Sequence, residues 1–353
     1  MSRTDEYDFD LPEQLIARHP LPRRQDSKLL AVQCSKQSFS HREFSDFASL
    51  LGSGDLLVLN DTRVVPARIL AKKPTGGKVE GLWLSTAENG QAHFLISGSR
   101  LRSGTELLLQ PKDFRIRLVE KTAPGRWLVE KESDLDWFSF LRQVGLTPLP
   151  PYIRNRRRQE GEEDESAEDQ ARYQSVWAEK AGAVAAPTAS LHFGQGLIDD
   201  LKASGVHVAT LTLHVGEGTF LPVETEEIEE HPIHEEWYEI PSDTVKALEE
   251  TRAQGGRIIS VGTTVCRALE SYGRSGKAVG LSQLFILPGF SFQWVDALLT
   301  NFHTPQSTLL ALVSAFAEHR GAKPGLEFVK AAYKEAIQES YRFYSYGDAS
   351  FWE

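Results

Sequence analysis

The hydrophobic pattern divides the chain into a middle part with short alternating runs and two outer parts with longer apolar runs. In the middle part, Gly-rich turns separate six β-type runs, at residues 64–71, 78–84, 92–97, 106–109, 114–120 and 126–130. Strands at this spacing without helices between them are typical of a small barrel or sandwich. Because helical patterns lie on both sides, we expect this part to be an insertion into a larger α/β domain.

Strand and helix patterns alternate in the outer parts, as in a mostly parallel sheet covered by helices. The predicted strands are 28–32, 55–59, 183–186, 206–213, 257–261, 283–287 and 295–302. The predicted helices are 11–16, 39–51, 196–203, 244–253, 265–272, 309–316 and 326–341. A hinge at 301–307 joins a buried strand to a buried helix, and Pro305 suits the first helical position.

Residues 154–171 interrupt this pattern with a run of four arginines followed by acidic residues. A run this polar cannot bury a core, so we expect a charged flexible loop. The loop could simply be solvated, or its basic half could hold the phosphates of a polynucleotide. The candidates for tRNA binding are Arg154, Arg156, Arg157 and Arg158.

Composition narrows the class of protein. The chain has 353 residues, 41% hydrophobic and 25% charged, which fits a globular protein with more than one domain. A net charge of −10 argues against general coating of nucleic acid but allows a local basic patch. No apolar run approaches the ~20 residues of a membrane helix, and the acidic start lacks a signal core, so we expect a cytoplasmic protein. Cys34 and Cys266 are far apart, which predicts neither a disulfide nor a thiolate metal site.

Gly, Thr and His gather where four of the predicted strands end, at 187–193, 214–220, 262–264 and 301–307. In open α/β sheets the carboxyl ends of the strands share an edge, and ligands bind there. Asn301 and Thr304 could merely cap the following helix. The four segments together predict one ligand crevice.

Other short motifs point to no different chemistry. The segment 216–218 follows a strand but opens no helix, so it is not a dinucleotide glycine loop, and no nucleophile-elbow motif is present. His231 and His234 resemble metal ligands, but Pro232 forbids a helix interior there and no third ligand completes the set. We therefore expect no metal.

Segments along the whole chain resemble the S-adenosylmethionine:tRNA ribosyltransferase-isomerase family of queuosine biosynthesis. They are residues 60–68, 76–80, 148–153, 182–189, 191–193, 213–220, 261–264 and 296–303. The resemblance implies a three-layer α/β/α domain, residues 1–61 and 150–353, with a small antiparallel β-barrel domain inserted at 62–149. It also implies transfer and isomerisation of the ribosyl moiety of S-adenosylmethionine, a co-substrate, onto 7-aminomethyl-7-deazaguanine at the wobble position of tRNA. Epoxyqueuosine-tRNA, adenine and methionine would be the products, and we expect a monomeric enzyme.

Such chemistry needs a group that takes a proton beside the sulfonium or from the attacking ammonium, and a group that protonates adenine. Side chains with a pKa near neutral serve both, which points to His192, His214 and His303. We expect these three to face one pocket, although one or two could act only as hydrogen-bonding partners of the others. The carboxylates suited to balance the sulfonium or bind ribose are Glu217, Asp61 and Asp296; Glu217 could equally be a solvated loop residue.

The same resemblance assigns residues to the binding of S-adenosylmethionine: Thr188, Gly216, Thr219, Gly262, Thr263, Thr264, Arg267, Asn301 and Ser307. Thr263 and Thr264 would receive the methionine carboxylate at a helix N-terminus. Arg267 could pair with that carboxylate or with Glu270 on its own helix.

The chain departs from the family pattern around the predicted pocket, at Ser190, Val265, Leu287 and Thr304. None of these changes removes a predicted histidine or carboxylate. A catalytically inactive paralogue that still binds tRNA therefore stays open as an alternative.

Overall fold

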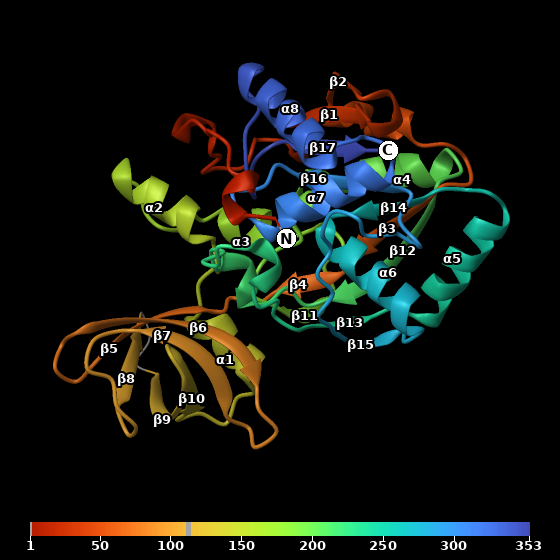
Figure 1. Ribbon diagram of the computed structural model, residues 1–353. Coiled ribbons are helices and arrows are strands. Elements are labelled where there is room, and N and C mark those ends of the chain that lie inside the picture. The colour runs from red at the N-terminus through yellow and green to blue at the C-terminus, as the bar shows by residue number, and fades with distance from the viewer. Residues whose placement is uncertain (1, 111–113) are drawn as a thin grey trace.

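A nine-stranded mixed sheet organises the larger part of the protein (Figure 1). The computed structural model describes residues 2–110 and 114–353. The strand order is β15 (Val279–Ser282), β13 (Glu236–Glu239), β12 (His207–Leu213), β3 (Leu56–Asn60), β14 (Ile258–Val261), β16 (Ala297–Asn301), β17 (Ala349–Trp352), β1 (Lys28–Gln33) and β2 (Ser38–Glu43). Strands β12, β3, β14 and β16 run parallel, so their carboxyl ends share one edge.

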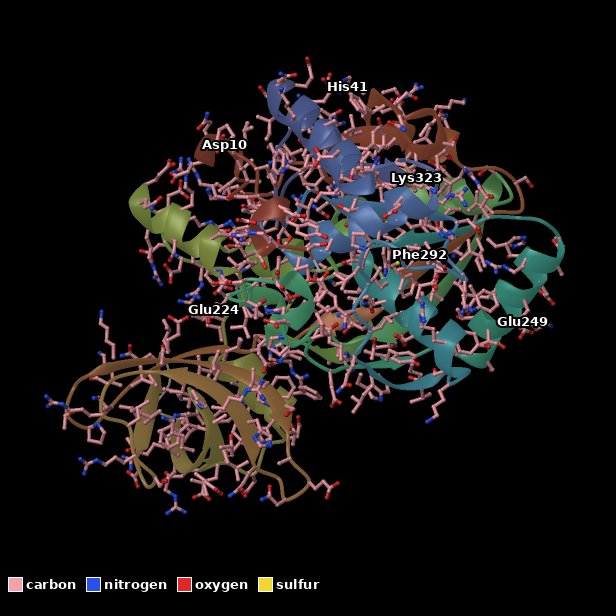
Figure 2. The ribbon with its side chains drawn as sticks, viewed as in Figure 1. Asp10, His41, Glu224, Glu249, Phe292 and Lys323 are labelled. Carbon is pink, nitrogen blue, oxygen red and sulfur yellow. The ribbon has the colours of Figure 1, made fainter. Side chains whose placement is uncertain are left out.

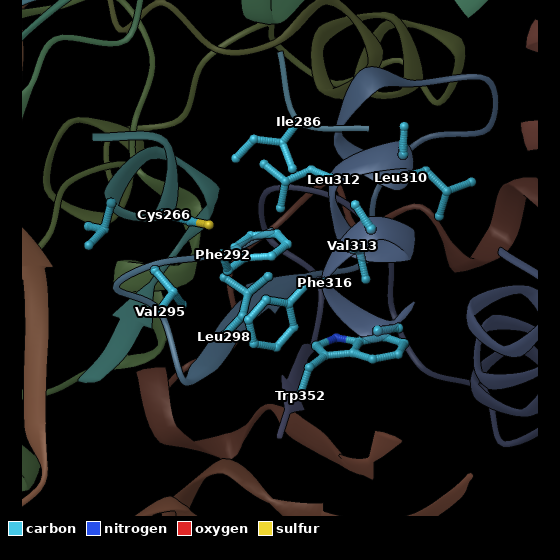
Figure 3. Close-up of a cluster of buried hydrophobic side chains, with 14 of the residues drawn as sticks. Cys266, Ile286, Phe292, Val295, Leu298, Leu310, Leu312, Val313, Phe316 and Trp352 are labelled. Atoms are coloured by element: carbon cyan, nitrogen blue, oxygen red, sulfur yellow. The ribbon is translucent and has the colours of Figure 1, made fainter. Parts of the chain in front are cut away.

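Helices cover both faces of this sheet, and the central strands β3, β14 and β16 are mostly apolar because both of their faces are buried. Leu56 and Val58 of β3 belong to the hydrophobic cluster that also contains residues of α5 (Ser242–Ala253), α6 (Thr263–Ser275), α7 (Thr308–His319) and α8 (Gly325–Gln338). Leu57 and Leu59 point the other way, toward α4 (Gln195–Ala203) and the 3₁₀ helix η5 (Phe44–Leu50). The predicted α/β/α layering is thus confirmed. Figure 3 shows buried hydrophobic side chains on the side of the sheet that α7 covers. Exposed side chains such as Glu249 of α5 lie at the periphery of the molecule (Figure 2).

The middle of the chain forms a closed antiparallel barrel, which confirms the predicted insertion (Figure 1). Its order is β10 (Arg126–Lys131), β7 (Ala92–Ser97), β6 (Lys78–Thr86), β5 (Arg68–Lys72), β8 (Glu106–Gln110) and β9 (Arg115–Ala123). Helix α1 (Trp137–Val144) packs Trp137 against Phe94 and Phe140 against Phe114. Residues 111–113 of the predicted insertion lie outside the described part of the chain.

Two predicted helices before the barrel are wrong. Residues 39–51 divide into β2, which pairs with β1 as an antiparallel edge, and η5. Edge pairing overrides the helical spacing because the exposed side of β2 is polar and needs no second layer. Residues 11–16 contain only the single turn η2 (Glu13–Leu15).

Two predicted strands after the barrel also differ. Residues 180–183 form β11 (Lys180–Ala183), which pairs with β4 (Thr62–Val64) in a separate two-stranded sheet. The segment 187–193 therefore does not follow a strand of the main sheet. Residues 283–287 are not a strand, and the edge of the sheet is instead β15.

The prediction of a flexible loop over residues 154–171 is wrong for much of its length. Helix α2 (Pro151–Gln159) begins with Pro151 in its first turn, and α3 (Asp169–Arg172) follows. Opposite charges neutralise each other across this segment, and Arg157 and Asp169 form a buried ion pair. The acidic half thus folds back on the basic half instead of extending into water.

Candidate active-site pocket

A cavity of about 120 Å³, called here the strand-end pocket, lies at the carboxyl ends of β14 and β16. Its walls come from residues 186–189, 262–264 and 300–304 together with Pro150, Tyr152, Tyr173, Val215, Thr219, Leu309, Tyr344 and Ser345. All four segments predicted to form a crevice contribute to it. The predicted ligand-binding residues that line it are Thr188, Thr219, Gly262, Thr263, Thr264, Asn301 and His303.

The N-terminus of α6 forms one wall of the pocket. Gly262 precedes the helix with φ 94°, a left-handed conformation that glycine adopts without strain. It is followed by Thr263 and Thr264, whose backbone N–H groups begin the helix and lack carbonyl partners within it. Thr264 Oγ1 accepts a hydrogen bond from Asn60 Nδ2 at 3.3 Å. A carboxylate in this pocket would meet free N–H groups and the positive end of the helix dipole.

His303 is the histidine that faces this pocket. Its Nε2 lies 2.9 Å from Thr300 Oγ1, and its backbone N–H donates to the Tyr333 hydroxyl at 3.1 Å. Burial lowers the pKa of His303 to about 3, so the imidazole is neutral at physiological pH.

His192 lies behind the pocket wall and lines a second, smaller cavity. Its Nδ1 is 2.8 Å from Ser27 Oγ, and its ring packs on Phe44 at 5.0 Å between centroids. Burial, together with a smaller effect of the nearby charge of Arg342, lowers the pKa of His192 to about 3. The second cavity reaches the strand-end pocket at Ser345, which lines both.

His214 faces a third space, the inter-domain cleft, defined by barrel residues such as Trp83 and Arg126 and by Trp237 of the sheet. Its Nδ1 is 2.8 Å from Thr62 Oγ1, and its ring stacks on Trp237 at 5.1 Å. Burial lowers the pKa of His214 as well. A side chain at Gly182 would come within 2.6 Å of His214 Nε2, so only glycine fits there.

The expectation that the three histidines converge on one pocket is therefore wrong. The physical reason is that residues 180–183 leave the main sheet, and that the loop after β12 turns toward the barrel. The expected pKa near neutral is also wrong for His192 and His303, because desolvation disfavours the imidazolium there, and burial lowers the pKa of His214 too.

The predicted carboxylates lie outside the strand-end pocket. Glu217 forms an ion pair with Arg126 of the barrel and faces the inter-domain cleft. Asp61 is buried, accepts from Thr212 Oγ1 at 2.6 Å, and has its pKa raised by that burial. Asp296 Oδ2 accepts from the backbone N–H of Ile258 at 2.9 Å.

Three residues assigned to S-adenosylmethionine hold the scaffold around the pocket instead. Arg267 pairs with Glu236, and Glu236 accepts from the Gly216 N–H at 3.1 Å. The alternative in which Arg267 pairs with Glu270 is not found, and Glu270 instead accepts from the backbone N–H groups of residues 293–295. Ser307 caps α7, which begins one residue later, so Pro305 is not the first helical residue.

Tyrosines form a wall of the pocket that sequence reasoning missed. Tyr152 and Tyr344 meet edge to face at 4.7 Å, and Tyr173 lies beside them in the wall. Tyr344 has φ 72°, a left-handed conformation uncommon for a bulky residue, which marks local strain. Tyr152 follows the Pro-rich segment 148–151 and could have been suspected there, but no local signal marks Tyr344.

The four arginines predicted to bind tRNA all have acidic partners. Arg157 is 1% exposed and pairs with Asp169, so its assignment to phosphate contacts is wrong. Arg154 pairs with Glu80, Arg156 with Glu13, and Arg158 with Asp164. Among them Arg158 has the most exposed side chain, at 50%.

The described residues contain no cluster of three or more His, Cys, Asp or Glu side chains arranged to hold a metal ion. Both Cys34 and Cys266 are buried free thiols. Within the ranges 2–110 and 114–353, none of the helices has the length and apolar character needed to cross a bilayer.

Acid is expected to destabilise the protein through His192 and His303. Both have a pKa of about 3 when folded, below the ~6.5 of an unfolded histidine, so their contribution is complete above pH 6.5 and is lost as pH falls toward 3. Each of the two histidines should lower the free energy of unfolding by ~1.4 kcal/mol for every pH unit below 6.5. Urea unfolding at pH 7.5, 6 and 5 measures this loss. In His303→Gln the free energy of unfolding should fall less steeply with falling pH, by the amount that about one bound proton contributes. An unchanged slope in that variant would contradict the burial of a neutral ring.

The fold and the pocket define a mixed α/β protein that carries an inserted barrel and a ligand site at its strand ends. A family model described as queuosine biosynthesis protein matches residues 4–352. The chain is 45% identical over 350 residues to the S-adenosylmethionine:tRNA ribosyltransferase-isomerase of Polynucleobacter asymbioticus, covering 98% of this chain and 96% of that protein. It is 44% identical to the protein of the same name from Trichlorobacter lovleyi, over 98% of both. A crystal structure of S-adenosylmethionine tRNA ribosyltransferase from Thermotoga maritima superposes with a TM-score of 0.55 and 35% identity, over 99% of this chain and 100% of that one. This chain belongs to the queuosine biosynthesis protein family.

Proposed function

We propose that this protein is an S-adenosylmethionine:tRNA ribosyltransferase-isomerase. It transfers and isomerises the ribosyl moiety of S-adenosylmethionine onto 7-aminomethyl-7-deazaguanine at the wobble position of tRNA, and releases adenine and methionine. Family membership over the whole chain carries this proposal. The strand-end pocket supports it, because it combines a helix N-terminus, an aromatic wall and one histidine.

The parts of S-adenosylmethionine have complementary walls in this pocket. Its carboxylate fits the N-terminus of α6 at Thr263 and Thr264, where free N–H groups are available. The purine ring fits the faces of Tyr152 and Tyr344. His303 then supplies a neutral imidazole to the ribosyl part, with no metal required.

The tRNA base approaches through the inter-domain cleft. Val215 lines both this cleft and the strand-end pocket, so the two spaces adjoin at that residue. The cleft has a volume of about 1140 Å³, enough for unstacked nucleotides of an anticodon loop. Trp237, stacked on His214, offers an aromatic surface there. We propose a cytoplasmic enzyme, because its substrate is tRNA, and a monomeric one.

The decisive experiment combines the purified protein, S-adenosylmethionine and tRNA that carries the aminomethyl deazaguanine. Release of free adenine together with a mass increase on the tRNA supports the proposal. The matched control is the same tRNA with unmodified guanine, which should release none. Binding of tRNA without adenine release would instead support the inactive paralogue, which no present finding favours.

Replacing Arg156 and Arg158 by Ala is expected to raise the KM for tRNA about 3- to 10-fold with little change in kcat, since phosphate contacts add salt-dependent affinity. Both side chains lie on the outer part of α2 and are partly exposed. Steady-state kinetics at 50 and 200 mM salt measure the effect. Arg23→Ala, at an exposed site whose partner is Asp26, is the control for charge alone. A collapse of kcat at constant KM would refute a role in affinity.

A further inference from the structure

Three buried polar side chains form a line from the smaller cavity to the strand-end pocket. Ser27 precedes β1, His192 ends the 3₁₀ helix η6 (Thr188–His192), and Asn301 ends β16. Ser27 Oγ lies 2.8 Å from His192 Nδ1. Asn301 lines the strand-end pocket, and His192 lines the cavity behind it. His192 therefore does not line the strand-end pocket itself, whereas Asn301 does.

Two atoms in this line lack hydrogen-bond partners although they are buried. They are His192 Nε2 and Asn301 Oδ1. Helix η6, which ends at His192, packs against β16, which ends at Asn301. Burial lowers the pKa of His192, and the Asn301 side chain opposes that shift as a hydrogen-bond acceptor would. A buried polar group without a partner is costly. The two atoms form no hydrogen bond with each other in this structure, but they are complementary if the imidazole carries its proton on Nε2.

The orientation of the Asn301 amide favours that tautomer. Asn301 Nδ2 donates to the Tyr344 carbonyl oxygen at 3.0 Å, which fixes the amide orientation and leaves Oδ1 toward the histidine. If the proton were on Nδ1, His192 Nε2 would be an acceptor like Asn301 Oδ1, and two acceptors repel each other. With the proton on Nε2, Nδ1 can accept from the Ser27 hydroxyl, whose oxygen also lies 3.4 Å from the Arg24 carbonyl oxygen, and the donor on Nε2 matches the acceptor Oδ1.

The line ends on the strained part of the pocket wall. Tyr344, whose carbonyl receives the Asn301 amide, has φ 72°, and its ring meets Tyr152 at 4.7 Å. Such strain persists only where surrounding contacts hold it. We propose that Ser27 and His192 are positioning residues that act through Asn301 to hold the Tyr344 wall, and that His192 does not carry a proton in the reaction. This inference rests on the proposed function of the pocket.

The tautomer of His192 tests the geometry without any turnover. The measurement is NMR spectroscopy of the protein labelled with ¹⁵N-histidine, and the His192→Gln variant serves to assign the His192 signals. The expected wild-type spectrum shows His192 protonated on Nε2 and neutral from pH 5 to 8. In Ser27→Ala the two tautomers should exchange, and Ser27→Thr should restore the wild-type signal. A wild-type ring protonated on Nδ1, or a charged ring at pH 6, would overturn the proposal.

Substitutions at His192 separate positioning from proton transfer. In His192→Gln the side-chain amide can donate from the place of Nε2, so kcat/KM should stay within about 5-fold of wild type and keep its pH profile. In His192→Leu that donor is lost, and S-adenosylmethionine should bind about 10-fold more weakly, as measured by calorimetry. A proton carrier would instead lose ~10²–10⁴-fold in kcat in His192→Gln. If the wild-type protein releases no adenine, the proposed function fails, while the tautomer and calorimetry still decide this inference.

Discussion

Replacing Arg157 with Leu is expected to lower the free energy of unfolding by about 3–5 kcal/mol, because it leaves a buried carboxylate without its charge partner. Arg157 is 1% exposed and Asp169 is 0% exposed. The guanidinium binds both carboxylate oxygens, at 2.5 and 3.0 Å, and also donates to the Arg18 carbonyl. Burial alone would raise the pKa of Asp169, but Arg157 and hydrogen bonds from Ser166 and Tyr346 hold it below its usual value.

Urea unfolding at pH 7.5 measures this loss. The matched control is Arg158→Leu, one residue along the same helix with a side chain that is 50% exposed, where a change below ~1 kcal/mol is expected. The double variant Arg157→Leu with Asp169→Leu should recover part of the stability, since no unpaired charge remains. If Arg157→Leu kept full stability but raised the KM for tRNA, the sequence-based assignment of Arg157 to phosphate binding would be restored.

The barrel and the central strands were predictable because their patterns are local. Gly-rich turns between alternating strands mark the barrel, and five-residue runs such as β3 and β16 are buried on both faces. Strand β17 could not be predicted in the same way. It is the last element of the chain yet lies between β16 and β1, and this placement depends on pairing partners about 50 and 320 residues away.

The pocket was predictable in outline but not in its chemistry. Residues 262–264 and 301–304 follow parallel strands, so the edge of the sheet places them together. His192 and His214 also lie in segments that were predicted to follow strands, but packing against Phe44 and against Trp237 decides their environment. The four arginines on α2 show the same limit. Their charge pattern is visible in the sequence, whereas the partner that neutralises Arg157 is set by the return of the chain at Asp169.

The largest effect on turnover is expected at His303. His303→Leu should lower kcat by ~10²–10⁴-fold with little loss of affinity for S-adenosylmethionine, as removal of a positioned acid or base does. It is the histidine that lines the strand-end pocket. Its Nε2 is held by Thr300 Oγ1 at 2.9 Å, which leaves Nδ1 as the ring nitrogen available to a ligand. Single-turnover adenine release and calorimetric titration of S-adenosylmethionine separate the chemical step from binding.

The pH dependence decides in which form His303 acts. Because burial lowers its pKa to about 3, His303 is already neutral in the free protein, and kcat/KM should show no acidic limb near pH 6.5 from this residue. Thr300→Val removes the group that orients the ring but keeps its shape, and a loss of about 10-fold without a new limb is expected. An acidic limb near 6.5 that disappears in His303→Gln would show that the ring is hydrated and titrates normally. The neutral imidazole would then have to be abandoned as the form that meets the substrate.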